Sequence, residues 1–257
     1  MSEVKNIAGL KEIFQNYDYF ILDQWGVMHD GYNGYPDAIK CISNLISHGK
    51  QLIIISNSSK KRKSTSKNLT SLGFNQNQFI EIMTSGEMVW KNLIDETFVK
   101  DKGLGKNCFH IFDKSKKDIV NFTEGLEKFN FVNSIDSASF ILGCTPFFNS
   151  RVIDYTPLLS EAIKNNLSFV CANPDLETVE NNSEKLIFCM GTIASLYENM
   201  GGKTIILGKP SKEIYMESTK SIPNIDKTKI LAIGDSLSHD TKGAIDFGID
   251  NLLITST

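Results

Sequence analysis

Short apolar runs alternate with helix-period segments along most of this chain of 257 residues. A short run of consecutive apolar residues is typical of a strand buried on both faces. Helical segments between such strands are typical of a parallel sheet, so the pattern predicts an α/β fold. The runs that we assign to the main sheet are YFIL (19–22), LIII (52–55), TIIL (204–207), ILAI (230–233) and NLLI (251–254).

The middle of the chain repeats this alternation independently. Apolar runs separated by helix-period segments predict a second set of strands there. We therefore expect a core formed by residues 1–83 and 204–257, with a second α/β domain inserted over 84–203. The strands predicted for the insert are FHIF (109–112), FILG (140–143), SFVCA (168–172) and KLIFCM (185–190).

Charge and composition exclude several classes of function. A net charge of −3 provides no overall basic field for nucleic acid or an anionic membrane. The N-terminal segment is charged, and no apolar run approaches the length of a membrane span, so we expect a cytoplasmic protein. The five cysteines are scattered, which favours small buried side chains in a reducing compartment over a zinc or redox pair.

Polar groups of one consistent chemistry follow four of the predicted main-sheet strands. Ligands of parallel α/β sheets bind beyond the carboxyl ends of the strands, where these groups would meet. Carboxylates are suited to a divalent cation such as Mg²⁺, and hydroxyl and ammonium groups are suited to phosphoryl oxygens. The groups are Asp23, Ser56 with Asn57, Lys209, and Asp235 with Asp240.

This order, Asp, Ser, Lys and GDxxxxD, resembles the four motifs of the haloacid dehalogenase-like hydrolase superfamily. Finer features are similar to its class IIA branch, which includes p-nitrophenyl phosphatases, pyridoxal phosphate phosphatases and phosphoglycolate phosphatases. The resemblance covers essentially the whole chain and implies a Rossmann-like core with an inserted α/β cap domain of the C2 type. The matching segments are GVMHDG (26–31), SNSS (56–59), MTSGE (83–87), CANPD (171–175), ILGKPS (206–211) and IGDSLSHDTKGA (233–244).

The resemblance implies a role for each matching residue of the core. Asp23 would attack phosphorus and form an aspartyl-phosphate, and Mg²⁺ would be bound by Asp23, Asp235 and the backbone carbonyl of Trp25. Ser56 and the amide of Asn57 would bind the transferring phosphoryl group. Lys209 would neutralise the oxygens of the nucleophile and the phosphate, and Asp240 would support the metal and the lysine from outside.

The inserted domain would then close over the site and recognise the organic part of a small phosphorylated metabolite. Asn173 and Asp175 are our candidates for substrate contact, with a simple Asx-type turn as the alternative. The surface of the insert is also a candidate surface for a homodimer.

Trp25 is the departure from the family pattern. Most phosphatases of the superfamily carry a second Asp there, which protonates the leaving oxygen and later activates water. An indole only donates through an N–H that does not titrate. The backbone carbonyl is retained, so the sequence predicts intact binding of Mg²⁺ and phosphate with impaired proton transfer. His29, Asp30 and His239 are possible substitutes.

Three functions are compatible with this pattern. The first is a Mg²⁺-dependent phosphatase, and the second is a catalytically silent protein that binds a phosphate ligand or acts as a regulator. The third is a dehalogenase, because dehalogenases of the superfamily also lack the second Asp and a halide leaves without a proton. We rank it last, because dehalogenases do not generally need the GDxxxxD motif that the chain retains.

Trp25 leads to a prediction about substrates. Aryl and acyl phosphates have weakly basic leaving groups, so they need the least protonation and should be hydrolysed faster than alkyl phosphates. Initial rates of the wild-type protein on matched aryl and alkyl esters test this expectation. Faster hydrolysis of the alkyl esters would contradict it.

Overall fold

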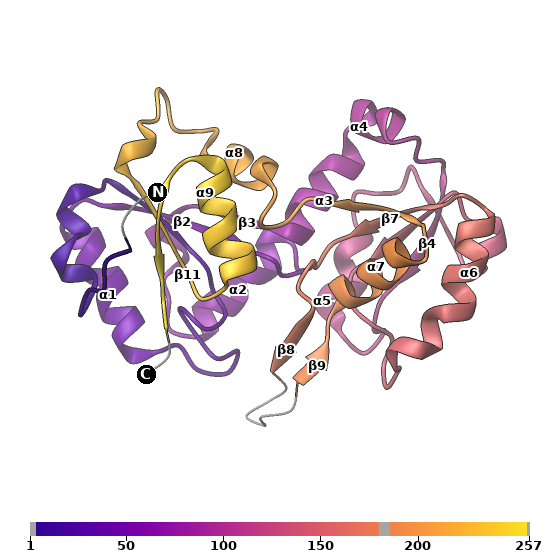
Figure 1. The fold of residues 1–257 in the computed structure, drawn as a ribbon, viewed down its shortest axis with the longest axis horizontal. Coiled ribbons are helices and arrows are strands. Elements are labelled where there is room, and N and C mark those ends of the chain that lie inside the picture. Colours follow the sequence, from indigo (N-terminus) through magenta and orange to yellow (C-terminus); the bar gives the residue numbers. More distant parts are fainter. Residues whose placement is uncertain (1–3, 180–185, 256–257) are drawn as a thin grey trace.

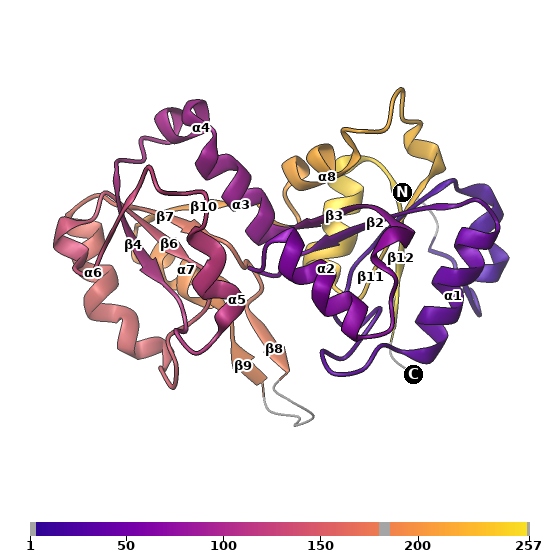
Figure 2. The ribbon, with the colours of Figure 1, turned by 180° about the vertical axis from the view of Figure 1, so that it is seen from behind.

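The computed structural model describes residues 4–179 and 186–255, which form two α/β domains side by side (Figure 1). The core domain contains both ends of the described chain, and the inserted domain carries a hairpin that extends downward from its side nearest the core (Figure 2). The predicted fold class is confirmed. Within these residues no helix combines the length and apolar character that a membrane crossing requires.

The core domain contains a five-stranded sheet in the order β12-β11-β1-β2-β3, in which every neighbouring pair is parallel. Its strands are β1 (Tyr19–Leu22), β2 (Gln51–Ser56), β3 (Phe79–Thr84), β11 (Ile230–Gly234) and β12 (Asp250–Leu253). Its helices are α1 (Pro36–Ser47), α2 (Arg62–Ser71), α8 (Lys212–Thr219) and α9 (Lys242–Phe247).

Helices cover both faces of this sheet. Successive side chains of a strand point to opposite faces, so each strand contributes to two apolar clusters. Phe20 of β1 and Ile54 of β2 pack in one cluster with residues of α1 and α2. Ile21 and Ile53, their neighbours along the chain, pack in a second cluster with residues of α8 and α9. Burial on both faces explains why these strands are almost entirely apolar.

The inserted domain has its own parallel sheet, in the order β10-β7-β6-β4-β5, and a separate antiparallel hairpin β8-β9. The strands are β4 (Asn107–Ile111), β5 (Asn130–Val132), β6 (Phe140–Gly143), β7 (Ser168–Cys171), β8 (Glu177–Val179), β9 (Leu186–Phe188) and β10 (Lys203–Ile206). The helices are α3 (Ser85–Ile94), α4 (Glu96–Asp101), α5 (Lys117–Val120), α6 (Thr156–Lys164) and α7 (Met190–Asn199).

The sheet pairing corrects one part of the sequence prediction. The sequence pattern predicts the run at 204–207 as a strand of the core sheet, but β10 pairs with β7 in the sheet of the insert. The position next to β2 that completes the core sheet is taken by β3, which was not predicted because Glu81 interrupts its apolar run. Residues 204–206 therefore belong to the inserted domain, and the chain returns to the core only after Ile206.

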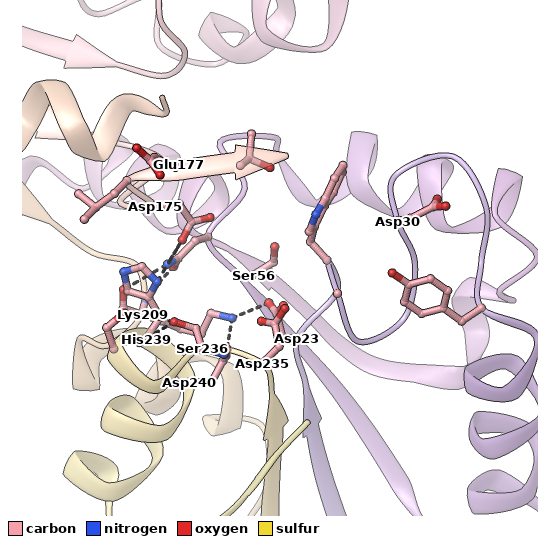
Figure 3. Close-up of a pocket in the computed structure, with 17 residues that line it drawn as sticks. Asp23, Asp30, Ser56, Asp175, Glu177, Lys209, Asp235, Ser236, His239 and Asp240 are labelled. Carbon is pink, nitrogen blue, oxygen red and sulfur yellow. Dashed lines mark hydrogen bonds and ion pairs between the residues drawn. The ribbon is translucent and has the colours of Figure 1, made fainter. Parts of the chain in front are cut away.

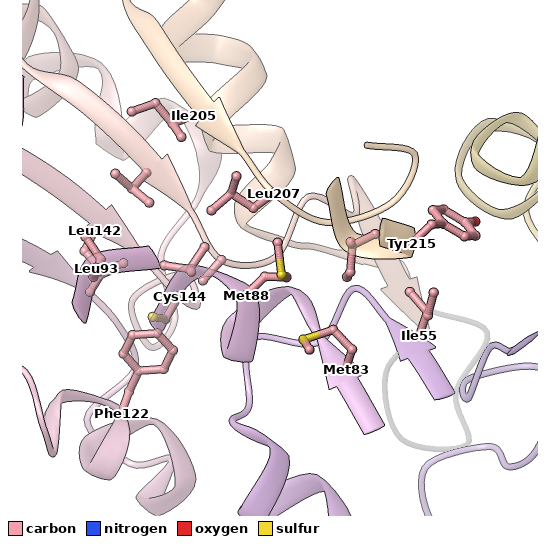
Figure 4. Packing of buried hydrophobic residues seen from close by; sticks show 14 of the residues in the cluster. Ile55, Met83, Met88, Leu93, Phe122, Leu142, Cys144, Ile205, Leu207 and Tyr215 are labelled. Carbon is pink, nitrogen blue, oxygen red and sulfur yellow. The ribbon is translucent and has the colours of Figure 1, made fainter. Parts of the chain in front are cut away.

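The two domains share one continuous apolar cluster (Figure 4). Met83 of β3, Met88 of α3 and Leu142 of β6 belong to it. Leu207, on the segment 207–211 that returns from β10 to the core, and Tyr215 of α8 also belong to it. Four of the five cysteines are buried, as the sequence predicts. Both chain crossings therefore run through packed apolar side chains, which holds the insert beside the carboxyl edge of the core sheet.

A prediction concerns the first crossing, where α3 packs against the loop after β2. The backbone N–H of Gly86 donates to the Ser58 carbonyl, and a Cβ on Gly86 would lie 2.0 Å from the Ser59 carbonyl oxygen. We expect Gly86→Ala to destabilise the protein by about 1–3 kcal/mol through this overlap. Chemical denaturation measures the effect. Gly9→Ala is the matched control, because no atom lies within 4 Å of a Cβ built there; equal stability of the two variants would contradict the expectation.

Candidate active site

A cavity of about 610 Å³ lies at the carboxyl edge of the core sheet and is lined by both domains (Figure 3). The ends of β1, β2 and β11 contribute Asp23, Ser56 and Asp235. The returning segment contributes Lys209, and the insert contributes a short stretch that begins at Asp175. The structure thus brings together residues that are far apart in the sequence, as the rule for parallel sheets predicts.

Lys209 lies at the centre of a buried ion network. Its Nζ donates to Asp23 Oδ1 at 2.5 Å and to Asp240 Oδ1 at 2.6 Å. All three side chains are buried. Charge-assisted hydrogen bonds of this length are among the stronger polar contacts in proteins, so the network fixes the position of the Asp23 carboxylate.

The pKa values of this network reflect its burial. Burial raises the pKa of Asp23 to about 7, although Lys209 opposes the shift, and Asp240 and Asp235 add to it. Burial disfavours the charged form of Lys209, but the carboxylates of Asp23 and Asp240 outweigh this effect and raise its pKa above the ordinary value. Three carboxylates face one ammonium group, and the excess negative charge suits a divalent cation.

The donor set fits Mg²⁺. Asp23, Asp235 and Asp240 have carboxylate oxygens within 4.8 Å of one another, and hard oxygen ligands are those that Mg²⁺ prefers. Both oxygens of Asp240 are already bonded, one by Lys209 and the other by the backbone N–H of Ser236. This geometry favours Asp23 and Asp235 as metal ligands, with Asp240 in a supporting role.

The loop after β1 brings the peptide of Trp25 close to the same carboxylates. Gly26 has a φ of +79°, and a Cβ there would lie 2.0 Å from Asp235 Oδ2, so the backbone passes directly against that side chain. Among the backbone hydrogen bonds in turns and loops of the described residues, none is accepted by the Trp25 carbonyl. The arrangement is consistent with this carbonyl as a further oxygen ligand.

Asn57 connects the core, the returning segment and the insert. Its Oδ1 accepts from the backbone N–H of Lys209 at 2.8 Å, and its Nδ2 donates to Asp175 Oδ1 at 2.8 Å. We expected Asn57 to bind phosphate, and the structure adds that it positions Lys209. Ser56 Oγ accepts a hydrogen bond of 3.3 Å from the backbone N–H of Ser58, and its side chain lines the cavity.

Asn173 and Asp175, the two insert residues that the sequence predicts as substrate contacts, differ in whether they line the main cavity. Asn173 Oδ1 accepts from the backbone N–H of Asp175, which is an Asx-type turn, and Asn173 does not line the main cavity. Asp175 does line it. Sequence reasoning missed Glu177 and Thr178 as lining residues, because β8 is too short for its periodicity to be recognised.

The three candidate substitutes for the missing acid/base have different environments. Asp30 is half-buried and accepts hydrogen bonds from the backbone N–H groups of Tyr32 and Asn33, and it lies on the far side of the cavity from Lys209 (Figure 3). His29 is buried outside the main cavity, and burial lowers its pKa to about 4. His239 lines the cavity with Nδ1 3.3 Å from Asp175 Oδ1. His239 is therefore the best placed of the three.

Comparisons with known proteins agree with this geometry. Residues 20–123 match a family model described as haloacid dehalogenase-like hydrolase, and residues 206–256 match a second model of HAD-like hydrolases. Phosphoglycolate phosphatase 1A of Arabidopsis thaliana is 25% identical over 98% of this chain and 72% of its own length.

Solved structures with the same fold include two hydrolases of bacterial origin. A haloacid dehalogenase-like hydrolase from Brucella suis has a TM-score of 0.85 and 28% identity, covering 96% of this chain and 88% of its own. A glycerol phosphate phosphatase from Mycobacterium tuberculosis, solved in complex with magnesium, has a TM-score of 0.70 and 17% identity. That match covers 94% of this chain and 69% of the other.

The raised pKa of Asp23 predicts a pH-dependent response to Mg²⁺. Between about pH 4 and pH 7 the folded site holds a proton that the unfolded chain has lost, so the metal-free protein loses stability as the pH rises through this range. Mg²⁺ must displace that proton at pH 5 but not at pH 8. We therefore expect Mg²⁺ to raise Tm more at pH 8 than at pH 5, measured against EDTA. Equal shifts at both pH values would contradict this assignment, and Asp23→Asn should lose most of the Mg²⁺ effect.

Proposed function

The chain belongs to the haloacid dehalogenase-like hydrolases, and we propose that it is a Mg²⁺-dependent phosphatase that hydrolyses a small phosphorylated metabolite through an aspartyl-phosphate. The observation that carries the proposal is the Lys209 network, which fixes a buried Asp23 beside Ser56 and Asp235 in one cavity. The phosphatase relative and the phosphatase of the same fold support the reaction class. The names of these proteins do not determine the substrate of this chain.

The reaction that the site would carry has two steps. In the first, an oxygen of Asp23 attacks phosphorus, the bond between phosphorus and the ester oxygen breaks, and the leaving oxygen takes up a proton. In the second, water attacks the phosphorus of the aspartyl-phosphate, which releases inorganic phosphate, a proton and the free Asp23 carboxylate. The net reaction consumes one water for each ester cleaved.

The residues of this chain divide the supporting work. Lys209 holds the Asp23 carboxylate and offsets the charge of phosphoryl oxygens, Ser56 binds one of those oxygens, and Asn57 holds the backbone of Lys209. Asp23, Asp235 and the Trp25 carbonyl would hold Mg²⁺. When bound, the cation would reduce the repulsion between the nucleophile and the anionic substrate.

Trp25 supports a second candidate function, a phosphate-binding protein that turns over slowly or not at all. The indole lines the cavity where the family pattern has an acid, and it supplies no titrating group. Dehalogenation has less support, since the carboxylate cluster suited to a metal is intact.

Asp23→Asn tests the first candidate. We expect Mg²⁺-dependent hydrolysis of p-nitrophenyl phosphate by the wild type and a loss of roughly 10³–10⁶-fold in the variant, because the nucleophile is removed. Asp37→Asn is the matched control, because Asp37 is an exposed residue on α1 that pairs only with Lys40 among the described ion pairs. A wild type as inactive as Asp23→Asn, with Mg²⁺ still bound, would favour the silent binding protein.

Trp25→Asp tests the explanation for slow turnover. Restoring an acid at this position should raise kcat on an alkyl phosphate by about 10²–10⁴-fold, since general acid/base help has that magnitude. Trp25→Phe keeps an aromatic ring without a titrating group and should give no such gain. If Trp25→Asp also gives none, proton transfer is not what limits this site.

A further inference from the structure

The indole of Trp25 forms part of the wall of the main cavity, at the proposed phosphate site, and is 41% exposed. A second cavity, of about 220 Å³, adjoins this wall, and Trp25, Ser56, Asp175 and Thr178 line both cavities. In the family pattern, the residue at position 25 protonates the leaving oxygen, which requires it to lie within hydrogen-bond reach of that atom. A side chain at this position therefore also contacts the organic part of the ester.

The loop after β1 holds this indole in place. A Cβ on Gly31 would lie 2.3 Å from two atoms of the Trp25 ring, and the His29 ring packs edge-on against the indole at 5.8 Å. Farther along the loop, the backbone N–H of Tyr35 donates to the Met28 carbonyl at 2.9 Å. Because these contacts lie within the loop itself, Trp25 and Tyr35 are positioned before any ligand binds, which lowers the cost of binding.

Asp30 and Tyr35, from the same loop, line the main cavity together with Trp25. Asp30 Oδ1 accepts from the backbone N–H groups of Asn33 and Tyr32 at 2.7 and 2.8 Å, and these bonds lower the pKa of Asp30, so the group is ionised at neutral pH. Burial raises the pKa of Tyr35, and the charge of Asp30 adds to this shift, so the two side chains are close enough to interact. Aromatic rings are the groups that recognise ammonium ligands, and an adjacent carboxylate adds the opposite charge.

The charge of the main cavity also favours a cation. The titratable groups of the described lining residues are the carboxyl groups of Asp23, Asp30, Asp175, Glu177, Asp235 and Asp240, with Lys209 and His239. Mg²⁺ and a phosphate dianion cancel in charge, so this lining remains acidic when both are bound. Lys60 lines the second cavity and not the main one, and its Nζ lies 3.1 Å from Asp118. An ammonium group is therefore favoured on the main-cavity side of the indole.

We propose that Trp25, Tyr35 and Asp30 bind an ammonium group of the substrate, so that the substrates are phosphate esters of small amino alcohols. The inference rests on the proposed phosphatase function and specifies its substrate class. An ammonium group near the leaving oxygen withdraws electrons and makes that oxygen less basic than in a simple alkyl ester. Such esters therefore need less protonation in the step for which Trp25 supplies no acid.

Binding measurements test the proposal without requiring turnover. The probes are phosphocholine and 3,3-dimethylbutyl phosphate, which have nearly the same shape because a carbon replaces the quaternary nitrogen. Isothermal titration is carried out on the Asp23→Asn protein with Mg²⁺, so that neither ester is cleaved. We expect phosphocholine to bind at least about tenfold more tightly, since the contact of a desolvated cation with an indole has that magnitude.

Two substitutions in this background locate the preference. Trp25→Leu removes the aromatic ring and should reduce the preference for phosphocholine to about threefold or less. Asp30→Asn removes the charge but keeps an oxygen that accepts from the two backbone N–H groups, and it should reduce the preference by about three- to fivefold. Asp37→Asn is the matched control, because it removes the same charge from an exposed site outside the main cavity, and it should keep the full preference.

The outcomes separate this proposal from the proposed function. Equal affinity for the two probes overturns the ammonium site, and so does a preference that survives in both cavity variants with unchanged Tm. A preference that falls in Trp25→Leu and in Asp30→Asn but persists in Asp37→Asn supports it. Absence of hydrolysis by wild-type protein, with the binding preference intact, would reject the phosphatase and leave the ammonium site in place.

Discussion

The buried contact of Lys209 with Asp23 and Asp240 is the interaction on which the rest of the site depends. It joins the end of β1, the short helix Leu237–Thr241 that follows β11, and the segment that returns from the insert. Removing one partner of a buried charge cluster leaves the others uncompensated, which is costly. The three segments are therefore held to one geometry, and the excess of carboxylates makes a cation part of the charge balance.

The position of Lys209 couples this network to the inserted domain. Lys209 lies on the returning segment after β10, and Asn57 holds its backbone while donating to Asp175 of the insert. The apolar cluster around Met88 and Leu207 makes the same connection by packing (Figure 4). A movement of the insert would therefore shift the position of Lys209, and the hydrogen bond from Lys209 would pass this shift on to Asp23.

Trp25 has a consequence beyond the missing acid. The indole is 41% exposed, packs edge-on against the His29 ring at 5.8 Å, and lines both cavities. A carboxylate at this position would provide proton transfer, but its side chain is smaller than the indole and would fill less of the space between the two cavities. The same side chain thus bears on the chemistry at phosphorus and on the space open to the organic part of a substrate.

The sequence by itself determined the fold class, the family and the residues at the carboxyl ends of β1, β2 and β11, because apolar runs and the polar residues that follow them are local patterns. It also located Lys209, although for a wrong reason, since β10 belongs to the other sheet. Only the tertiary structure decided that β3 completes the core sheet, that Asn57 holds Lys209, that Asn173 forms a turn, and that Trp25 of the core and Asp175 of the insert line one cavity. These facts depend on pairing and packing between distant segments, and the order of residues along the chain does not specify such contacts.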